Sequence, residues 1–322
     1  MLDIVVVNYN STDYLLGCLK SIYESMNGIK INVIVQDNGS EDNMDRILQV
    51  FPQVRLTKSI NNRGFARAVN KGLEQGEAPY IVLLNPDTLV LNGCFHEVLE
   101  YMEKNPDVGI VGPKVLDVGG TVQGSARAFP TPLTGLFGRN TIITRLFPNN
   151  IITRMNVLTK KCLDGKPMEV DWVSGACMVL RRKAIDDVGF MDQRFFLYWE
   201  DADWCRRMWE KGWKVVYHPK PAIIHAVGGS SSKRPIRSLI EFHKNCYKFF
   251  NKYNEPYLKF FSPFVAAALA GRLVLSILIH KTGPLFKKLK PSQSGKELRL
   301  NQGQKYEEAP SYCPPEHRES YH

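Results

Sequence analysis

Short apolar runs alternate with amphipathic segments along the first 90 residues. The apolar runs are rich in β-branched side chains and predict buried strands at residues 4–9, 31–40, 54–59 and 80–88. The segments between them carry apolar residues at helical spacing and predict helices at residues 11–25, 41–51 and 64–76. Strands that alternate with helices form right-handed βαβ units, so we predict an α/β fold with a mostly parallel central sheet flanked by helices.

The pattern changes in the second half of the chain. Gly, Pro and Thr are frequent between about residues 115 and 170, which predicts a long loop with short strands. The pattern then predicts a strand and a short helix over 170–189, two strands over 213–229 and a basic, aromatic helix over 235–255.

Residues 260–279 form a nearly continuous apolar stretch that Pro263 and Arg272 interrupt. Its length is that of a membrane-spanning helix. Basic and aromatic residues flank it on both sides, which favours a helix that dips into the membrane or lies in its surface. A full span and a helix packed on the α/β domain are the alternatives.

These patterns predict three parts. Residues 1–232 form the α/β domain, and residues 233–290 form a basic and apolar helical extension that associates with a membrane. Residues 291–322 are polar and lack a hydrophobic pattern, which predicts a disordered tail.

Charge narrows the class of partner. The 322 residues carry a formal net charge of +10, and bases dominate over residues 127–154 and 233–290. Such a surplus favours an anionic partner, namely nucleic acid, an anionic membrane face or a phosphate-bearing substrate. Because no helix-turn-helix, zinc-finger or aromatic RNA-binding signature accompanies the charge, we expect no nucleic-acid partner.

Cysteine usage and the first residues indicate the compartment. Seven cysteines are scattered without a C-x-x-C pair, which argues against a disulfide framework or a zinc site and favours a reducing compartment. The chain starts with a strand-like run and shows neither the basic region nor the cleavage site of a secretory signal. We therefore expect a cytoplasmic location.

Polar residues follow two of the predicted strands, where ligands bind in parallel sheets. Asp37 lies in the polar stretch 36–40 that ends the run 31–40, and it could accept a hydrogen bond from a pyrimidine N3–H or a ribose hydroxyl. Asp87, in the stretch Asn-Pro-Asp-Thr at 85–88, could hold Mg²⁺ or Mn²⁺ against a diphosphate, since these hard cations prefer oxygen ligands. Taken singly, both stretches are also ordinary turn chemistry.

Two further positions suit a phosphorylated ligand. Asn62, Arg63 and Gly64 stand at a predicted helix start, where backbone N–H groups and the helix dipole favour an anion. His225 follows an apolar run and could complete a metal site with Asp87, although a lone histidine at a strand end is often structural. No G-x-G-x-x-G motif follows the first strand, which argues against a dehydrogenase.

The stretch 196–213 concentrates acids and tryptophans. Three acids fall within four successive positions, Glu200, Asp201 and Asp203. Four tryptophans lie around them in the sequence: Trp199, Trp204, Trp209 and Trp213. A sugar hydroxyl needs a carboxylate to remove its proton before it attacks an anomeric carbon, and aromatic faces pack on sugar rings. The stretch thus predicts a carbohydrate acceptor site, while a helix N-terminus whose acids complement the dipole is the alternative.

Taken in order, these stretches resemble the inverting family-two glycosyltransferases of the GT-A (Rossmann-like) fold, in the rhamnosyltransferase and galactofuranosyltransferase-like branch. The resemblance covers about residues 1–245 and makes 1–232 the GT-A domain. It implies Asp201 as catalytic base, supported by Glu200 and Asp203, and Asp87 with His225 as metal ligands. It assigns nucleotide-sugar binding to Asn8, Asp37, Asn62, Arg63, Gly64, Asn85, Trp172, Ser174 and Gly175. Asn85 stands where the family's D-x-D-type motif has its first acid.

The resemblance also implies an activity and partners. We expect metal-dependent, inverting transfer of a sugar, best L-rhamnose from dTDP-rhamnose, onto a hydroxyl of a polyprenyl-diphosphate-linked or polysaccharide acceptor in cell-surface glycan synthesis. The protein would lie at the cytoplasmic face of the membrane, with an anionic surface or the carrier diphosphate meeting Lys233, Arg234, Arg237, Lys244 and Lys248.

Two alternatives stay open. A UDP-sugar donor, carrying galactofuranose or an N-acetylhexosamine, would offer the base pocket the same pattern as thymine. A catalytically silent sugar- or lipid-binding scaffold is supported by Asn85 in place of an acid. For the enzyme, we expect the fold to bring Asp87, Asp201 and His225 around one cleft.

Overall fold

A computed structural model describes residues 1–26, 28–131, 134, 155–162, 165–226 and 235–288. A nine-stranded sheet runs through it in the order β3-β2-β1-β4-β10-β6-β11-β5, with β8 paired to β11. The first four strands in sequence are parallel: β1 (Leu2–Asn8), β2 (Ile31–Asp37), β3 (Arg55–Lys58) and β4 (Tyr80–Leu84). All seven residues of β1 are buried, as expected for a central strand covered on both faces.

The other half of the sheet mixes directions. β10 (Cys177–Arg181) is antiparallel to both β4 and β6 (Val108–Leu116), and β11 (Lys214–His225) is parallel to β6. Antiparallel to β11 lie β5 (Thr88–Val90) and β8 (Met168–Glu169), while β7 (Ala126–Arg127) and β9 (Trp172–Val173) form a separate pair.

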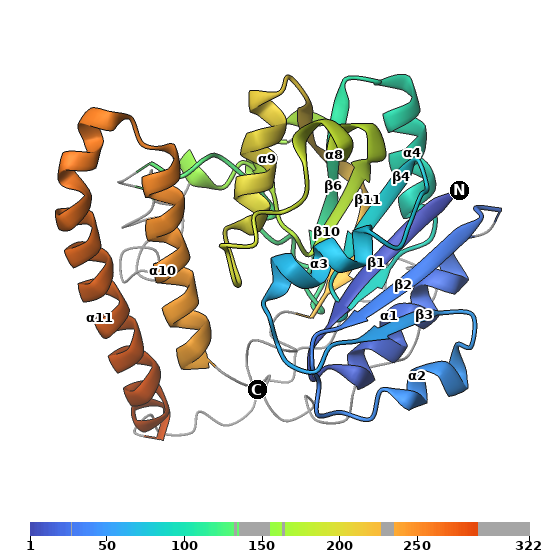
Figure 1. Cartoon of the computed structure of the whole chain (residues 1–322), viewed down its shortest axis with the longest axis horizontal. Helices are drawn as coiled ribbons and strands as arrows, with labels where there is room; N and C mark the ends of the chain where they lie inside the picture. The colour runs from blue at the N-terminus through green and yellow to red at the C-terminus, as the bar shows by residue number, and fades with distance from the viewer. Residues whose placement is uncertain (27, 132–133, 135–154, 163–164, 227–234, 289–322) are drawn as a thin grey trace, which may run out of the picture.

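Helices cover both faces of the sheet (Figure 1). One core lies between the sheet and α1 (Thr12–Ser25), α2 (Asp45–Val50) and α4 (Cys94–Lys104). The other lies under α3 (Phe65–Leu73), α8 (Arg182–Val188) and α9 (Glu200–Glu210). The prediction of an α/β fold with a mostly parallel sheet flanked by helices is therefore confirmed.

Some predicted elements differ from the structure. The two strands predicted over 213–229 are one strand, β11, whose register against β6 is irregular between His218 and Ala222. Pro219 and Pro221 lie in that interval, and a proline cannot donate to a strand ladder. Strand β6 and helix α4 are not among the predicted elements, and residues 135–154 of the predicted loop lie outside the described residues.

Two long helices follow the sheet domain and stand side by side next to α9 (Figure 1). They are α10 (Pro235–Tyr253) and α11 (Ser262–Lys288), joined by the short helix η2 (Pro256–Phe261). The Trp199 Nε1–H group donates to the Phe242 carbonyl (3.0 Å), and Asn245 Nδ2 donates to the Leu197 carbonyl (2.8 Å). Helix α10 is thus fixed to the loop that precedes α9.

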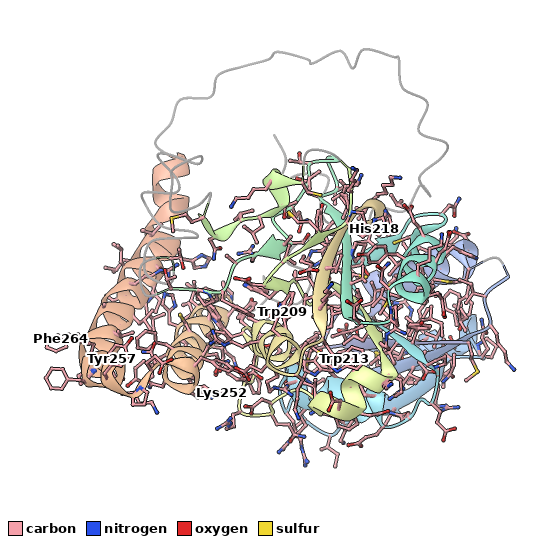
Figure 2. The ribbon with its side chains drawn as sticks, turned by 90° about the horizontal axis from the view of Figure 1, so that it is seen from above. Trp209, Trp213, His218, Lys252, Tyr257 and Phe264 are labelled. Carbon is pink, nitrogen blue, oxygen red and sulfur yellow. The ribbon has the colours of Figure 1, made fainter. Side chains whose placement is uncertain are left out.

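Helix α11 leaves an apolar face uncovered. Tyr257 and Phe264 point away from the rest of the molecule (Figure 2), and they are 70% and 67% exposed. Residues Lys259–Lys281 are long and apolar enough to cross a membrane, and 6% of their most apolar window is buried. The predicted domain boundary at 232/233 and the predicted tail 291–322 lie outside the described residues, so the three-part division stays a prediction.

Candidate active site

A pocket of about 690 Å³ opens at the carboxyl ends of the parallel strands β1, β2 and β4. Val7, Asn38 and Asn85 line it from these strand ends. The loop between β9 and β10, the residues that lead into α9, and side chains of α10 and α11 complete its wall. The polar strand ends and the acidic stretch therefore meet in one place, as the sequence predicts.

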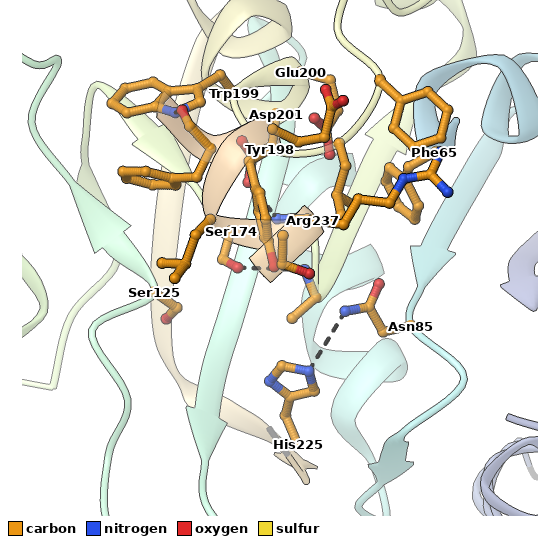
Figure 3. A pocket seen from close by; sticks show the side chains of 18 of the residues that line it. Phe65, Asn85, Ser125, Ser174, Tyr198, Trp199, Glu200, Asp201, His225 and Arg237 are labelled. Carbon is orange, nitrogen blue, oxygen red and sulfur yellow. Dashed lines mark hydrogen bonds between the residues drawn. The ribbon is translucent and has the colours of Figure 1, made fainter. Parts of the chain in front are cut away.

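Asp87, His225 and Asp201 all line this pocket. Glu200 and Asp201 lie on one side of it, and His225 and Asn85 lie on the other (Figure 3). The carboxylate that was expected to act as base and the pair that was expected to bind metal thus face a common space. The structure describes this arrangement, while the chemical roles of these residues remain proposals.

Strand pairing explains why residues 87 and 225 meet. Thr88 of β5 lies opposite His225 in the antiparallel ladder with β11, and Ala226 N–H donates to the Asp87 carbonyl (2.9 Å). As a result, His225 Nε2 lies 3.3 Å from Asp87 Oδ1 and 3.4 Å from Asn85 Nδ2. Backbone hydrogen bonds thus bring Asp87 and His225 together although they are more than a hundred residues apart in the sequence.

The donor set suits a hard divalent cation. His225 Nδ1 lies 3.3 Å from Gln123 Oε1, so a proton on Nδ1 leaves the Nε2 lone pair on the side of Asp87. The Asp87 carboxylate and the His225 imidazole are oxygen and nitrogen ligands that Mg²⁺ or Mn²⁺ accepts, and Asn85 turns its Nδ2 group towards His225 Nε2. Among the described residues, no group of three or more His, Cys, Asp or Glu side chains gathers here, so phosphate oxygens and water would supply the remaining ligands.

Asp201 is held by two backbone donors. Its Oδ2 accepts the N–H of Gly175 (3.0 Å), and its Oδ1 accepts the N–H of Ala202 (2.8 Å). Gly175 belongs to the loop between β9 and β10, so one bond crosses from the sheet to the first turn of α9. The carboxylate is therefore oriented before any ligand enters.

Burial perturbs the two adjacent acids. It raises the pKa of Asp201, with the two backbone bonds and the charge of Arg127 opposing the rise. It raises the pKa of Glu200 well above the ordinary value, and the neighbouring Asp201 charge adds to the effect. Because the two buried carboxyl groups are adjacent, a charge on Asp201 opposes ionisation of Glu200.

The backbone before α9 is strained. Tyr198 and Trp199 have positive φ angles of 69° and 75°, which non-glycine residues seldom adopt. Phe65 N–H donates to the Phe196 carbonyl (2.7 Å), and α10 holds the Trp199 indole, so neighbouring elements maintain the conformation. At Gly64 (φ 96°), a Cβ would lie 2.8 Å from the Phe196 carbonyl oxygen, so this position requires glycine for close packing.

Several residues expected to bind the nucleotide sugar reach the pocket. They are Asn62, Asn85, Trp172, Ser174 and Gly175. Arg127 is stacked over the Trp172 ring (5.3 Å to the centroid) and lines the pocket beside it. The Arg127 guanidinium is close enough to Asp201 to interact with its charge, and it comes from the Gly-, Pro- and Thr-rich stretch that predicted a long loop with short strands.

Other residues expected to bind the nucleotide sugar do not line this pocket. Asn8 Nδ2 donates to Asp37 Oδ1 (3.1 Å), and Asp37 Oδ2 accepts the Ser40 N–H (3.1 Å), so these buried side chains bond one another. Neither residue lines the pocket, and neither do Arg63 and Gly64. The residues that reach it from these segments are Tyr9, Asn10, Asn38 and Asn62.

Asp203 does not belong to the pocket, which corrects its expected catalytic role. It is fully buried, and its carboxylate accepts hydrogen bonds from Arg207 (3.0 Å), Lys252 (2.5 Å) and Tyr253 (2.8 Å). Lys252 and Tyr253 belong to α10, so Asp203 ties that helix to α9. Asp203 and Asp201 are two residues apart on a helix and point about 200° apart around its axis.

The tryptophans also divide. Trp199 lines the pocket, but the indoles of Trp204, Trp209 and Trp213 pack against the second core. Their N–H groups donate to the Gly189 carbonyl, the Val170 carbonyl and Asp187 Oδ2. Figure 2 shows Trp209 and Trp213 within the sheet domain. The aromatic frame inferred around the acids is therefore mostly core packing, and a single indole of the four faces the pocket.

Three comparisons bear on this site. The sequence profile described as Glycosyl transferase family 2 matches residues 3–189. The chain is 30% identical over 261 residues to an N-acetylglucosaminyl-diphospho-decaprenol L-rhamnosyltransferase of Mycobacterium tuberculosis, covering 77% of this chain and 83% of that protein. It is 24% identical over 290 residues to the dTDP-rhamnosyl transferase RfbF of Shigella flexneri, covering 86% of each.

Solved structures share the fold at low sequence identity. The mannosyltransferase PcManGT of Pyrobaculum calidifontis, solved with GDP-Man and Mn²⁺, superposes with a TM-score of 0.53 at 17% identity, over 90% of this chain and 81% of that one. GalNAc-T7, solved with UDP, GalNAc and Mn²⁺, gives a TM-score of 0.53 at 14% identity, over 70% of this chain and 44% of that one. At these identities the likeness supports the GT-A fold alone.

Proposed function

The chain belongs to glycosyltransferase family 2, and from that premise we propose that it transfers L-rhamnose from dTDP-rhamnose to a hydroxyl of a lipid-diphosphate-linked glycan. The observation that carries the proposal is the single pocket that Asp201 shares with Asp87 and His225. The names of two relatives support the sugar, and one of them also supports a decaprenyl diphosphate acceptor. Both support a place in cell-surface glycan synthesis.

The positions of the side chains suggest an inverting displacement. Asp201 accepts the proton of the acceptor hydroxyl as general base, since the backbone N–H group of Gly175 already orients its carboxylate. His225 lies on the other side of the pocket (Figure 3), 3.3 Å from Asp87, and these two residues would hold a divalent cation against the donor diphosphate. Attack from the side of Asp201 and departure toward His225 invert the anomeric carbon, and no covalent intermediate with the protein is required.

Asp87 and His225 are the proposed ligands of Mg²⁺ or Mn²⁺. When bound, such a cation neutralises the charge that develops on the leaving diphosphate. The contact of 3.3 Å between His225 Nε2 and Asp87 Oδ1 supports this assignment. Asn85 contributes an amide in place of a second acid, so the site carries one negative charge less than a site with two carboxylates.

A donor panel tests the proposal. The full chain is incubated with a synthetic polyprenyl-diphosphate-linked N-acetylglucosamine, Mn²⁺ and, in turn, dTDP-rhamnose, UDP-galactofuranose and UDP-N-acetylglucosamine. We expect nucleoside diphosphate release and a new lipid-linked disaccharide with dTDP-rhamnose, product inversion by NMR, and loss of turnover on chelation. Transfer from a UDP-sugar but not from dTDP-rhamnose would show that the proposed donor is wrong. Nucleotide binding without any transfer would favour the catalytically silent scaffold.

We also propose that α11 associates with the cytoplasmic face of a membrane. Support comes from its exposed apolar face, which includes Val274 (58% exposed) and Leu278 (53% exposed). Substituting either by Asp should reduce co-flotation with phosphatidylglycerol vesicles, because a charge opposes burial in the lipid. Val50→Asp on α2 is the matched control, since Val50 is 59% exposed and apolar. Equal co-flotation of the α11 variants and wild type would contradict the association.

A further inference from the structure

Helix α11 carries a stripe of polar side chains along one face, although most of its residues are apolar. Arg272, Ser276 and His280 recur every four residues and therefore lie on one side of the helix. All three line the pocket that contains Asp201. Val274 and Leu278 are exposed on the same helix and do not line the pocket. The helix thus presents polar groups to the pocket and apolar groups to its surroundings.

The stripe lies on the side of the catalytic acids. The Arg272 guanidinium stands over the Phe242 ring of α10 (5.8 Å to the centroid), and that ring packs against Trp199 (5.5 Å between centroids). Trp199 directly precedes Glu200 and Asp201. A continuous wall of aromatic side chains therefore connects Arg272 to the proposed base. His225 lies on the other side of the pocket (Figure 3), and Asp87 contacts it at 3.3 Å.

Positive charge exceeds negative charge on this part of the wall. The described residues that α10 and α11 contribute to the pocket include Arg237 and Arg272, against the single acid Glu241. Desolvation lowers the pKa of His243, the histidine of α10 in this wall, so it stays neutral. Arg272 lines the pocket, where its guanidinium can meet an anionic group of a ligand.

We propose that Arg272, Ser276 and His280 bind the diphosphate of the lipid-linked acceptor. This inference rests on the proposed function, and it assigns a place to the acceptor that the donor site does not provide. The diphosphate lies on the stripe, its sugar extends along Phe242 and Trp199 to Asp201, and its lipid follows the exposed apolar face of α11. Arginine suits the role because its planar guanidinium forms paired hydrogen bonds with phosphate oxygens.

A binding measurement tests the stripe without requiring turnover. Farnesyl diphosphate is titrated against the full chain and against the variants Arg272→Gln and His280→Gln. We expect each variant to bind about tenfold more weakly, the loss of one charge-assisted hydrogen bond. Lys281→Gln is the matched control, because Lys281 is exposed on the same helix and does not line the pocket. It should bind like wild type.

Two further titrations separate the sources of the phosphate. Affinity for nucleoside diphosphate should be unchanged in both variants, and an equal loss there would assign the stripe to the donor and overturn the proposal. Co-flotation with phosphatidylglycerol vesicles should also be unchanged, and a loss there that matches the loss for farnesyl diphosphate would assign it to lipid headgroups. Unchanged farnesyl diphosphate affinity in both variants would likewise overturn the proposal.

The design keeps this inference separate from the proposed function. His280 is exposed, so His280→Gln should unfold at the wild-type temperature and report on binding alone. If Arg272 has only a structural role over Phe242, Arg272→Gln lowers the unfolding temperature and His280→Gln leaves the affinity unchanged. Failure of sugar transfer in the donor panel would refute the proposed function, while the titrations would still decide whether the stripe binds an isoprenoid diphosphate.

Discussion

Replacing Asp201 by Asn is the sharpest test of the catalytic assignment. The substitution keeps the size of the side chain and removes its charge and basicity. In wild type both carboxylate oxygens accept backbone N–H groups, from Gly175 (3.0 Å) and Ala202 (2.8 Å). The Asn oxygen can accept one of these bonds, and its NH₂ group then faces the other donor.

The structure sets the expected size of both effects. Loss of a positioned general base should lower kcat by about 10²–10⁴-fold, which corresponds to about 2.7–5.4 kcal/mol of barrier. One unpaired backbone donor costs about 1–3 kcal/mol of stability, partly offset because a buried charge is also removed. Donor affinity should be unchanged, since His225 lies on the other side of the pocket (Figure 3) together with Asp87, which contacts it.

Turnover is measured by nucleoside diphosphate release with saturating donor and acceptor, and donor affinity is measured by calorimetric titration. Because burial raises the pKa of Asp201, the wild-type rate should fall with decreasing pH through a value above the ordinary aspartate pKa of about 3.9. The variant should lose that acidic limb. A variant rate within about threefold of wild type, with an unchanged limb, would remove Asp201 from the role of base.

Three more outcomes follow from the site. Glu200→Gln should gain stability over wild type as the pH rises above the ordinary glutamate pKa, because burial raises the pKa of Glu200 and the folded state holds its proton more tightly than the unfolded chain does. Thermal unfolding across pH measures the difference in stability, and a difference that does not change with pH would refute the prediction. Asp203→Asn should lower the free energy of unfolding in urea by about 3 kcal/mol, because Lys252 and Arg207 lose a buried partner. The kcat of the folded fraction should stay within a few fold of wild type, and a kcat loss like that of Asp201→Asn would give Asp203 a catalytic role. His225→Ala should weaken Mn²⁺-dependent nucleotide binding by about tenfold or more without changing metal-free binding, and equal losses in both would argue against a metal ligand.

Local patterns predict the first half of the sheet because its central strands β1 and β4 are buried along their whole length, although the edge strand β3 is not. Strand β1 has no exposed residue, so its composition alone marks it, and the helices between strands carry clear apolar stripes. The pairing of β5 with β11 has no such local sign. Thr88 and His225 are neighbours through a ladder between distant segments, so residue chemistry could only suggest that Asp87 and His225 meet, and the family resemblance supplied the assignment.

Within the site, the sequence contains one signal that the prediction did not use. If residues 200–210 form a helix, Asp201 and Asp203 must point to opposite sides, and both cannot face one substrate. The pairing of Asp203 with Lys252 and Tyr253 is different, because it depends on how α10 packs and no local pattern announces it. The same holds for Arg272, which interrupts an apolar run in the sequence and lines the pocket in the fold.

The buried bonds of Asp203 have a mechanical consequence. These bonds join α9, whose first turn carries the proposed base, to α10. Because α10 packs along α11, the three helices form one connected unit. If the outer face of α11 rests on a lipid surface, the elevation of Asp201 above that surface is constant. The enzyme would then select acceptor hydroxyls by their distance from the membrane, because only a hydroxyl that the lipid carrier holds at that distance can reach Asp201.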